Sequence, residues 1–382
     1  MSISNLFFGV NGEFLKALLL LPVILLMYML SSKLYVKRRR RSYSFLTKTT
    51  MALLIFNTVV ILATSIISIA NVQPNLLTLF ITGISNAGYI TILYGLFRIQ
   101  NSADLKTQFF YFGPAILTAA TGLLSPAISN LICLFSLIAI ITLFRKKLGR
   151  GHLITVASSL YGLSLIILTI SNLFTFNHGA INVITQILPV VTYTIIMISL
   201  LEHSLVIMHS SYVSAITDSL TGLYNRRYFD KIISSFVNRN TPVNVIFSDI
   251  DNFKKINDNE GHKVGDEVLQ KVASILMEEV NGYGVAGRYG GEEMVVLVQD
   301  PDIDMNELTE KMRYRIEKET IATASIGYRM FEANVPPNQL IEQADAAMYL
   351  AKQKGKNCVV RYRSQSSEAA AIDTGSAIIS NG

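Results

Sequence analysis

Charge is what this chain lacks most. Only 16% of its 382 residues are charged, against roughly 25% in a typical soluble domain, while 51% are hydrophobic. Acidic residues are scarcest early on, because residues 1–200 hold 14 Lys or Arg but only 2 Asp or Glu, whereas the remainder holds 19 and 25. This composition excludes a chain that is soluble throughout. We expect residues 1–200 to lie in a membrane and the remainder to lie in water.

Cysteine is also scarce, with Cys133 in an apolar run and Cys358 in the polar part. Two distant cysteines exclude a disulfide framework and a cysteine metal site, and they favour a reducing cytoplasm for the polar part. The net charge of +6 would raise nucleic acid as a partner. The basic excess lies in loops between apolar runs, however, so we predict membrane orientation and no nucleic-acid partner.

Long apolar runs are abundant in residues 1–200. A bilayer core needs about 20 apolar residues per helix, and seven runs come close to that length: 13–32, 50–70, 76–97, 108–124, 127–144, 153–176 and 182–201. The first is not a cleaved signal peptide, because its basic cluster 37–41 follows the apolar run. The connections are alternately basic and uncharged, which predicts seven spans, an external amino terminus and a cytoplasmic polar part.

The predicted spans hold few ionisable residues beyond Glu13 and Lys16, so an anchor or sensor is a better interpretation than a transporter. Polar residues within the spans can line a ligand pocket or form interhelical hydrogen bonds, and hydrogen bonding is the simpler interpretation. They are Asn57, Asn86, Tyr89, Asn172 and Gln186.

A helical connector is predicted for residues 201–217. Its apolar positions recur at spacings of four and three, which is typical of two coiled-coil heptads: Leu201, Leu205, Met208, Tyr212 and Ala215. A helix that simply leaves the membrane would show the same short pattern, so both interpretations stay open.

Strand and helix patterns alternate from residue 218 to 363, which predicts an α/β sheet domain. The expected elements are a helix from the N-cap Asn225 to Val237, a strand 243–250, a loop around Gly261, a helix 265–280, a hairpin turning at Gly290-Gly291, a helix 304–319, a strand 321–329, a helix 337–354 and a strand 357–363. Residues 364–382, rich in Ser and Ala, are predicted to be disordered.

Carboxylates gather at two points of this pattern. The apolar run 243–247 ends in Ser-Asp-Ile-Asp, and residues 288–294 read Arg-Tyr-Gly-Gly-Glu-Glu-Met. A strand that ends in Asp249 and faces a turn bearing Glu292 and Glu293 suits Mg²⁺ holding a nucleoside triphosphate. We expect the glycine turn to need positive φ and to leave room for a nucleotide.

These motifs, in this order, resemble the GGDEF-domain diguanylate cyclases over residues 218–363. The matching segments are 218–227, 249–254, Asn257-Asp258, Gly261-His262, Gly265-Asp266, 288–294 and 345–357. The resemblance implies a palm-like fold with a central, mostly antiparallel sheet flanked by helices. It also implies a homodimer that joins two GTP into cyclic di-GMP and releases two pyrophosphates.

The resemblance assigns roles to particular residues. Asp249, the backbone carbonyl of Ile250 and Glu292 would hold two Mg²⁺ ions, with Mn²⁺ as the alternative metal. Glu292 or Glu293 would accept the proton of the ribose 3′-hydroxyl, and we favour Glu292.

The implied substrate contacts come from several further residues. Guanine would be bound by Asn257 and Asp266, which taken alone would be a turn residue and an N-cap. His262 would contact the nucleotide or close the loop. Phosphate contacts are implied for Phe253 through its backbone amide and for Lys254, Lys352 and Lys356, with Lys254 counted among the catalytic residues. Arg288, Gly290 and Gly291 complete the substrate-binding set.

Three departures from the family pattern have different consequences. Met294 replaces a usual Phe at little cost, and Lys356 replaces a usual Arg, which weakens one phosphate contact. Many family members carry Arg-x-x-Asp where this chain reads Asn281-Gly282-Tyr283-Gly284. We therefore predict that inhibition by product through that site is absent.

The sequence thus predicts a multi-span diguanylate cyclase of a bacterial inner membrane, dimeric through its connector and membrane helices, with GTP as substrate and lipid around residues 1–200. The alternative is a non-catalytic receptor for GTP or cyclic di-GMP that signals by protein contact.

Overall fold

The protein is described by a computed structural model that covers residues 9–70, 75–101, 105–144, 152–174, 179–239, 241–332 and 335–363. The basic loop 145–150 and the predicted disordered tail 364–382 lie outside the described residues. The chain divides into two compact units, Met1–Met208 and His209–Gly382. The division falls inside the predicted connector.

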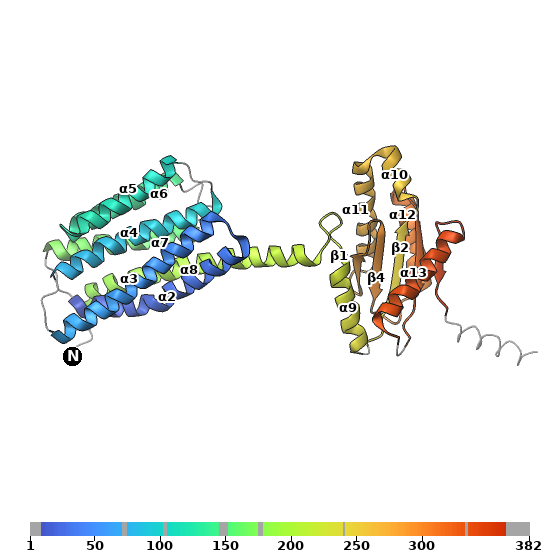
Figure 1. Ribbon diagram of the computed structural model, residues 1–382, viewed down its shortest axis with the longest axis horizontal. Coiled ribbons are helices and arrows are strands. Elements are labelled where there is room, and N and C mark those ends of the chain that lie inside the picture. Colours follow the sequence, from blue (N-terminus) through green and yellow to red (C-terminus); the bar gives the residue numbers. More distant parts are fainter. Residues whose placement is uncertain are drawn as a thin grey trace, which may run out of the picture. The chain divides into compact units, whose positions relative to one another are not determined.

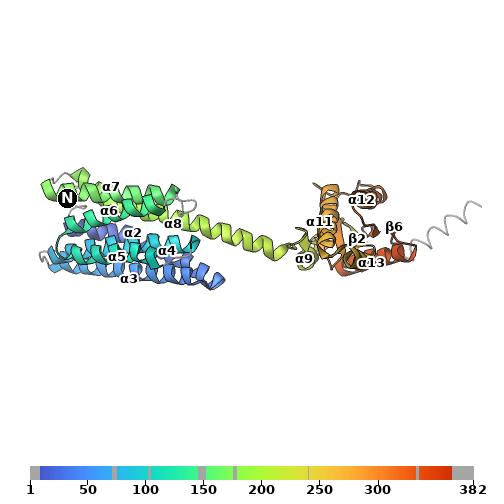
Figure 2. The same ribbon diagram turned by 90° about the horizontal axis from the view of Figure 1, so that it is seen from above.

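The first unit is a bundle of helices that lie side by side in both views (Figures 1 and 2). They are α2 (Gly9–Arg38), α3 (Arg41–Ala70), α4 (Asn75–Gln100), α5 (Leu105–Gly122), α6 (Pro126–Phe144), α7 (His152–Phe174) and α8 (Gly179–Ile216). Within the described residues, five of these helices are long and apolar enough to cross a membrane: α2, α3, α4, α7 and α8. The apolar stretch of α6 is shorter, at Pro126–Thr142. Five of the seven predicted spans are thus matched by candidate helices, and the count of seven stays a prediction.

Polar side chains inside the bundle join neighbouring helices. The Asn86 amide donates to Asn130 Oδ1 at 3.0 Å, and Tyr161 donates to Asn86 Oδ1 at 3.1 Å. The Asn57 amide donates to the backbone carbonyl of Ala17 at 2.7 Å. Interhelical hydrogen bonding, the simpler of the two interpretations, is therefore confirmed for Asn57 and Asn86.

Helix α8 continues without a break through the predicted connector. Leu205, Met208 and Tyr212 are 56%, 55% and 55% exposed, although large apolar side chains gain from burial. This exposed apolar seam suits pairing with a second copy of the helix, and the coiled coil stays a prediction.

The second unit is built on a six-stranded mixed sheet in the order β1-β3-β4-β2-β5-β6. The strands are β1 (Tyr224–Asn225), β2 (Asn244–Ile250), β3 (Gly284–Arg288), β4 (Glu293–Val298), β5 (Ala324–Arg329) and β6 (Val359–Arg361). The three central pairs are antiparallel and the two outer pairs are parallel. The predicted mixed sheet, mostly antiparallel at its centre, is confirmed.

Helices cover both faces of this sheet (Figure 1). They are α9 (Arg226–Asn238), α10 (Phe253–Glu260), α11 (His262–Glu279), α12 (Met305–Glu319) and α13 (Pro337–Gln353). Side chains alternate along β2, so Val245 and Phe247 share a buried cluster with α9 and α13, whereas Ile246 and Ile250 share one with α11 and α12. Burial on both faces explains why β2 is apolar until its end.

The expected elements from residue 225 onward are largely confirmed, and Asn225 caps α9 by accepting from the Tyr228 amide at 3.0 Å. The predicted break at Gly261 is confirmed, since this residue is non-helical with a φ of 88°. The break is narrower than predicted, because residues 253–260 form helix α10 and α11 begins at His262 instead of near Gly265. Asn257 and Asp266 therefore lie inside helices, and their interpretations as a turn residue and an N-cap are wrong.

Substitution of Gly327 tests the packing of α13 on β5. A methyl group there would lie 2.1 Å from the Met348 backbone nitrogen and 2.3 Å from the Ala344 carbonyl oxygen. Because both neighbours are backbone atoms, we expect Gly327→Ala to cost at least about 3 kcal/mol, measured by urea denaturation of residues 209–382. Gly291→Ala is the matched control, since a methyl group at Gly291 would meet no atom within 4 Å. Equal stability of the two variants would contradict this packing.

Candidate active site

The two central strands, β2 and β4, bring the acidic residues together at one end of the sheet. Asp249 near the end of β2 lies opposite Glu293 at the start of β4. The Ile250 amide donates to the Glu292 carbonyl at 3.3 Å, which ties the end of β2 to the glycine turn. The predicted meeting of a strand-end Asp with a turn bearing two Glu is present in the structure.

The turn itself differs from the prediction. Neither Gly290 nor Gly291 has positive φ, and the turn is longer than two residues, because the Tyr289 and Gly290 amides both bond the Glu293 carbonyl, at 2.8 and 3.3 Å. Crowding favours glycine at position 290 but not at position 291. A methyl group on Gly290 would lie 2.2 Å from Glu293 Oε2, whereas Gly291 borders open space.

Arg288 braces this turn. Its guanidinium donates to the Gly291 carbonyl at 2.7 and 3.2 Å and to Asp218 Oδ1 at 3.0 Å. Although burial opposes it, hydrogen bonds from Thr221 and Arg288 lower the pKa of Asp218 and keep it ionised. These contacts are structural, and contact between Arg288 and a substrate stays a prediction.

The carboxylates at the strand end repel one another in a partly dry environment. Burial raises the pKa of Asp249, Glu292 and Glu293, and the charge of Asp249 raises the pKa of both glutamates further. Lys352 opposes this by pairing with Asp249 Oδ2 at 2.7 Å. A cation bound beside these three carboxylates would therefore reduce their repulsion.

Asp345 is a member of this cluster that we did not predict. Burial is the main cause that raises the pKa of Asp249 and Glu293, and the charge of Asp345 raises both further. Burial also raises the pKa of Asp345 itself. The spacing of seven residues from Lys352 could have identified it, because residues seven apart lie on one face of a helix.

The two residues predicted to bind guanine are brought close by a glycine. Asn257 on α10 lies against Gly265 on α11, where a methyl group would be 1.9 Å from Asn257 Oδ1. Asp266 follows Gly265 in the same helix and is exposed, as is His262 at the helix start. The amide and the carboxylate thus come from adjoining helices near one point.

The residues predicted to contact phosphate lie on α10, on α13 and in the turn after α13. Lys254 is exposed on the first turn of α10, and the Phe253 side chain is buried in the core beneath it. Lys356 donates to Asn252 Oδ1 at 2.7 Å from the turn after α13. Asp251 holds that turn by accepting from the Asn357 amide at 3.0 Å.

The carboxylates at the end of β2 are hard oxygen donors of the kind that Mg²⁺ prefers. Among the described residues, no group of three His, Cys, Asp or Glu side chains is arranged to hold a metal. Mg²⁺ commonly uses one or two carboxylates plus phosphate oxygens. Asp249 and Glu292 repel each other, and the Ile250 backbone lies beside them, so the set fits a cation that is completed by a phosphate ligand.

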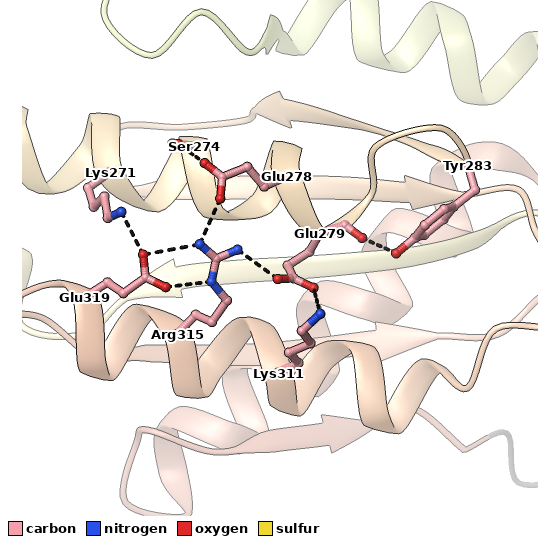
Figure 3. Close-up of polar contacts among 8 residues, drawn as sticks. All are labelled: Lys271, Ser274, Glu278, Glu279, Tyr283, Lys311, Arg315 and Glu319. Atoms are coloured by element: carbon pink, nitrogen blue, oxygen red, sulfur yellow. Dashed lines mark hydrogen bonds and ion pairs between the residues drawn. The ribbon is translucent and has the colours of Figure 1, made fainter.

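The segment 281–284, where related sequences carry Arg-x-x-Asp, is built differently here. Gly284 cannot be replaced without movement, since a methyl group would lie 2.7 Å from the Leu297 carbonyl oxygen. The Tyr283 hydroxyl donates to the Glu279 carbonyl (Figure 3). Nearby, Arg315 on α12 pairs with Glu278 and Glu279 on α11, both at 2.8 Å (Figure 3). The basic groups of this surface are engaged in fastening α11 to α12.

The sheet order and the acidic strand end beside a braced glycine turn define a mixed α/β domain with a candidate cation and nucleotide site. Residues 215–358 match the family "Diguanylate cyclase, GGDEF domain". The chain therefore contains a GGDEF domain, preceded by a region with several apolar helices.

Curated relatives support the same conclusion for this part of the chain. The response regulator PleD of Caulobacter vibrioides is 37% identical over 177 residues, which is 42% of this chain and 37% of that protein. Diguanylate cyclase DosC of Escherichia coli is 37% identical over 156 residues, 37% of this chain and 34% of that protein. The chain thus spans little more than a third of these relatives. A solved structure of the coiled coil and GGDEF domain of DgcB from Caulobacter crescentus, in complex with c-di-GMP, is 26% identical with a TM-score of 0.40, covering 42% of this chain and 93% of that one.

Removal of one carboxylate charge tests the electrostatics of the site. The folded-state pKa of Glu292 lies above its ordinary value of 4.5, so ionisation costs stability as the pH rises through that folded-state pKa. Glu292→Gln should therefore raise the melting temperature of residues 209–382 by about 1–3 °C at neutral pH in EDTA, and the gain should vanish below pH 4.5. Glu342→Gln on an exposed position of α13 is the control. A pH-independent difference would contradict the repulsion.

Proposed function

We propose that this protein is a diguanylate cyclase of a bacterial inner membrane, with its amino terminus outside and its GGDEF domain in the cytoplasm. Two GTP molecules are condensed into cyclic di-GMP with release of two pyrophosphates. The observation that carries the proposal is the cluster of Asp249, Glu292 and Glu293, in which burial raises all three pKa values and the charge of Asp249 raises those of both glutamates further.

The reaction needs a base, a positioned nucleotide and a partner. The 3′-oxygen of one GTP attacks the α-phosphorus of the other, a P–O bond forms, and pyrophosphate leaves. The proton of the 3′-hydroxyl passes to Glu292, whose pKa is raised by burial and by the charge of Asp249, which makes its carboxylate a stronger base. Repeating the step with the roles exchanged closes the ring.

The residues around this base supply binding and orientation. Asn257 and Asp266 bind the guanine edge, the amide through both its groups and the carboxylate through the ring N–H and amino hydrogens. Lys254, Lys352 and Lys356 supply positive charge to the phosphates. Gly291 borders open space, so the nucleotide approaches the turn closely there.

Mg²⁺ is the metal that the proposal implies, with two ions per site held by Asp249, the Ile250 carbonyl and Glu292. When bound, it neutralises phosphate charge and activates the attacking oxygen. Lys352, which pairs with Asp249 at 2.7 Å, then becomes available to a phosphate group.

A homodimer is part of the proposed mechanism, because each domain holds one GTP and the two nucleotides of the product come from separate GTP molecules. The exposed apolar seam of α8 and the membrane helices hold the two copies parallel. A signal that rotates the paired helices would change how the two domains face each other.

The experiment that tests the function measures cyclic di-GMP formed from GTP and Mg²⁺ by the full chain in nanodiscs. We expect product from the wild type and a loss of about 10²-fold or more in Glu292→Ala, with Glu342→Ala unchanged. If the wild type binds GTP but forms no product, the proposed cyclase activity is wrong and the protein is a non-catalytic receptor.

The same preparation tests feedback by product. Because the segment Asn281–Gly284 lacks an Arg and an Asp, we expect micromolar cyclic di-GMP to leave the initial rate unchanged. Non-competitive inhibition that Asn281→Ala abolishes would show that the segment binds product after all.

A further inference from the structure

The helical unit contains a cavity that is lined by both polar and apolar side chains. Its free volume is about 80 Å³, and α2, α3, α4, α6, α7 and α8 all contribute lining residues, whereas α5 contributes none. A water molecule needs roughly 10–15 Å³ of such volume, so the cavity has room for about five to eight water-sized groups. This is the size of a small metabolite.

An ion pair lies in the wall of this cavity. Lys16 Nζ and Glu13 Oε2 on α2 are 2.6 Å apart, and their side chains are only 17% and 19% exposed. Charges inside an apolar helix are costly and commonly mark a ligand or ion site. Both residues lie on one helix, three positions apart, where an ion pair forms without a partner helix.

One hydrogen-bond acceptor on α8 lines the same cavity without a partner among the described residues. Gln186 Oε1 is buried and has no hydrogen-bond partner among the described residues, which is costly unless a ligand or water supplies a donor. Pro189, one turn further on, has no N–H to give to the Thr185 carbonyl. By contrast, Asn57 and Asn86, which also line the cavity, bond neighbouring helices.

We propose that this cavity binds a small zwitterion that carries one ammonium and one carboxylate group. Glu13 and Gln186 Oε1 accept from the ammonium, and Lys16 pairs with the carboxylate. A neutral zwitterion exchanges one ion pair for two and buries no net charge, whereas a singly charged ligand leaves an unbalanced charge in a low-dielectric site.

The proposal deepens the sensory role assigned to the membrane region and rests on that role. Gln186 and Pro189 belong to α8, which continues to Ile216 through the connector. A ligand that bonds Gln186 in one state of α8 better than in another shifts the equilibrium between those states. The cavity and the connector are thus joined by a single helix.

Isothermal titration calorimetry of the full chain in nanodiscs tests the assignment. The probes are glycine, alanine and γ-aminobutyrate, with butyrate and butylamine as analogues that each keep one charge. The variants are Lys16→Met and Gln186→Leu, and Gln108→Leu on α5, which contributes no lining residue, is the matched control. Thermal melting of each variant verifies that it is folded.

We expect at least one zwitterion to bind, with no heat from either single-charge analogue. Lys16→Met and Gln186→Leu should each weaken binding about tenfold or more, equivalent to about 1.4 kcal/mol, and Gln108→Leu should not. Absence of heat from all three zwitterions, equal binding of an analogue, or full binding by both cavity variants would each overturn the assignment. Because binding is measured without GTP, its failure is distinguishable from a failure of cyclase activity.

Discussion

Repulsion between carboxylates at the end of β2 is the constraint on which the active-site architecture depends. Asp249 is buried and yet lies close enough to Glu292 to raise the pKa of that group. Folding keeps these like charges together because the apolar face-to-face packing of β2 outweighs the electrostatic cost. A bound cation would remove this electrostatic cost. The repulsion that opposes folding is therefore also the reason why the proposed metal binding is favourable.

Several contacts hold this arrangement in place without belonging to it. Asp251 accepts from Thr323 and Ser325 at 2.7 and 2.6 Å, which anchors the end of β2 to β5. Arg288 joins the glycine turn to Asp218, at the start of the domain. Asn225 in turn donates to the Ala215 carbonyl at the end of α8. Hydrogen bonds therefore tie both the end of α8 and the glycine turn to the segment 218–225.

The helical region uses polar groups in two ways. Asn86, Asn130 and Tyr161 satisfy one another across α4, α6 and α7 and give that part of the bundle a specific packing. The Glu13–Lys16 pair and Gln186 Oε1 join no helices. The first group of polar side chains stabilises the helix packing, whereas the second group is available to a ligand. The residue types alone do not distinguish the two groups.

The division into an apolar and a polar half, the strands and most helices of the second half, and the carboxylates of the candidate site were all predictable from the residues in order. Those features depend on local periodicity, charge counts and motif spacing. Three features emerge only in the folded chain: Asn257 packs against Gly265, Arg288 bonds Asp218, and the glycine turn does not use positive φ. The fold also places Asp345 with Asp249 and leaves Gln186 Oε1 without a partner among the described residues. These outcomes depend on distances between residues far apart in the chain, which a local pattern does not encode.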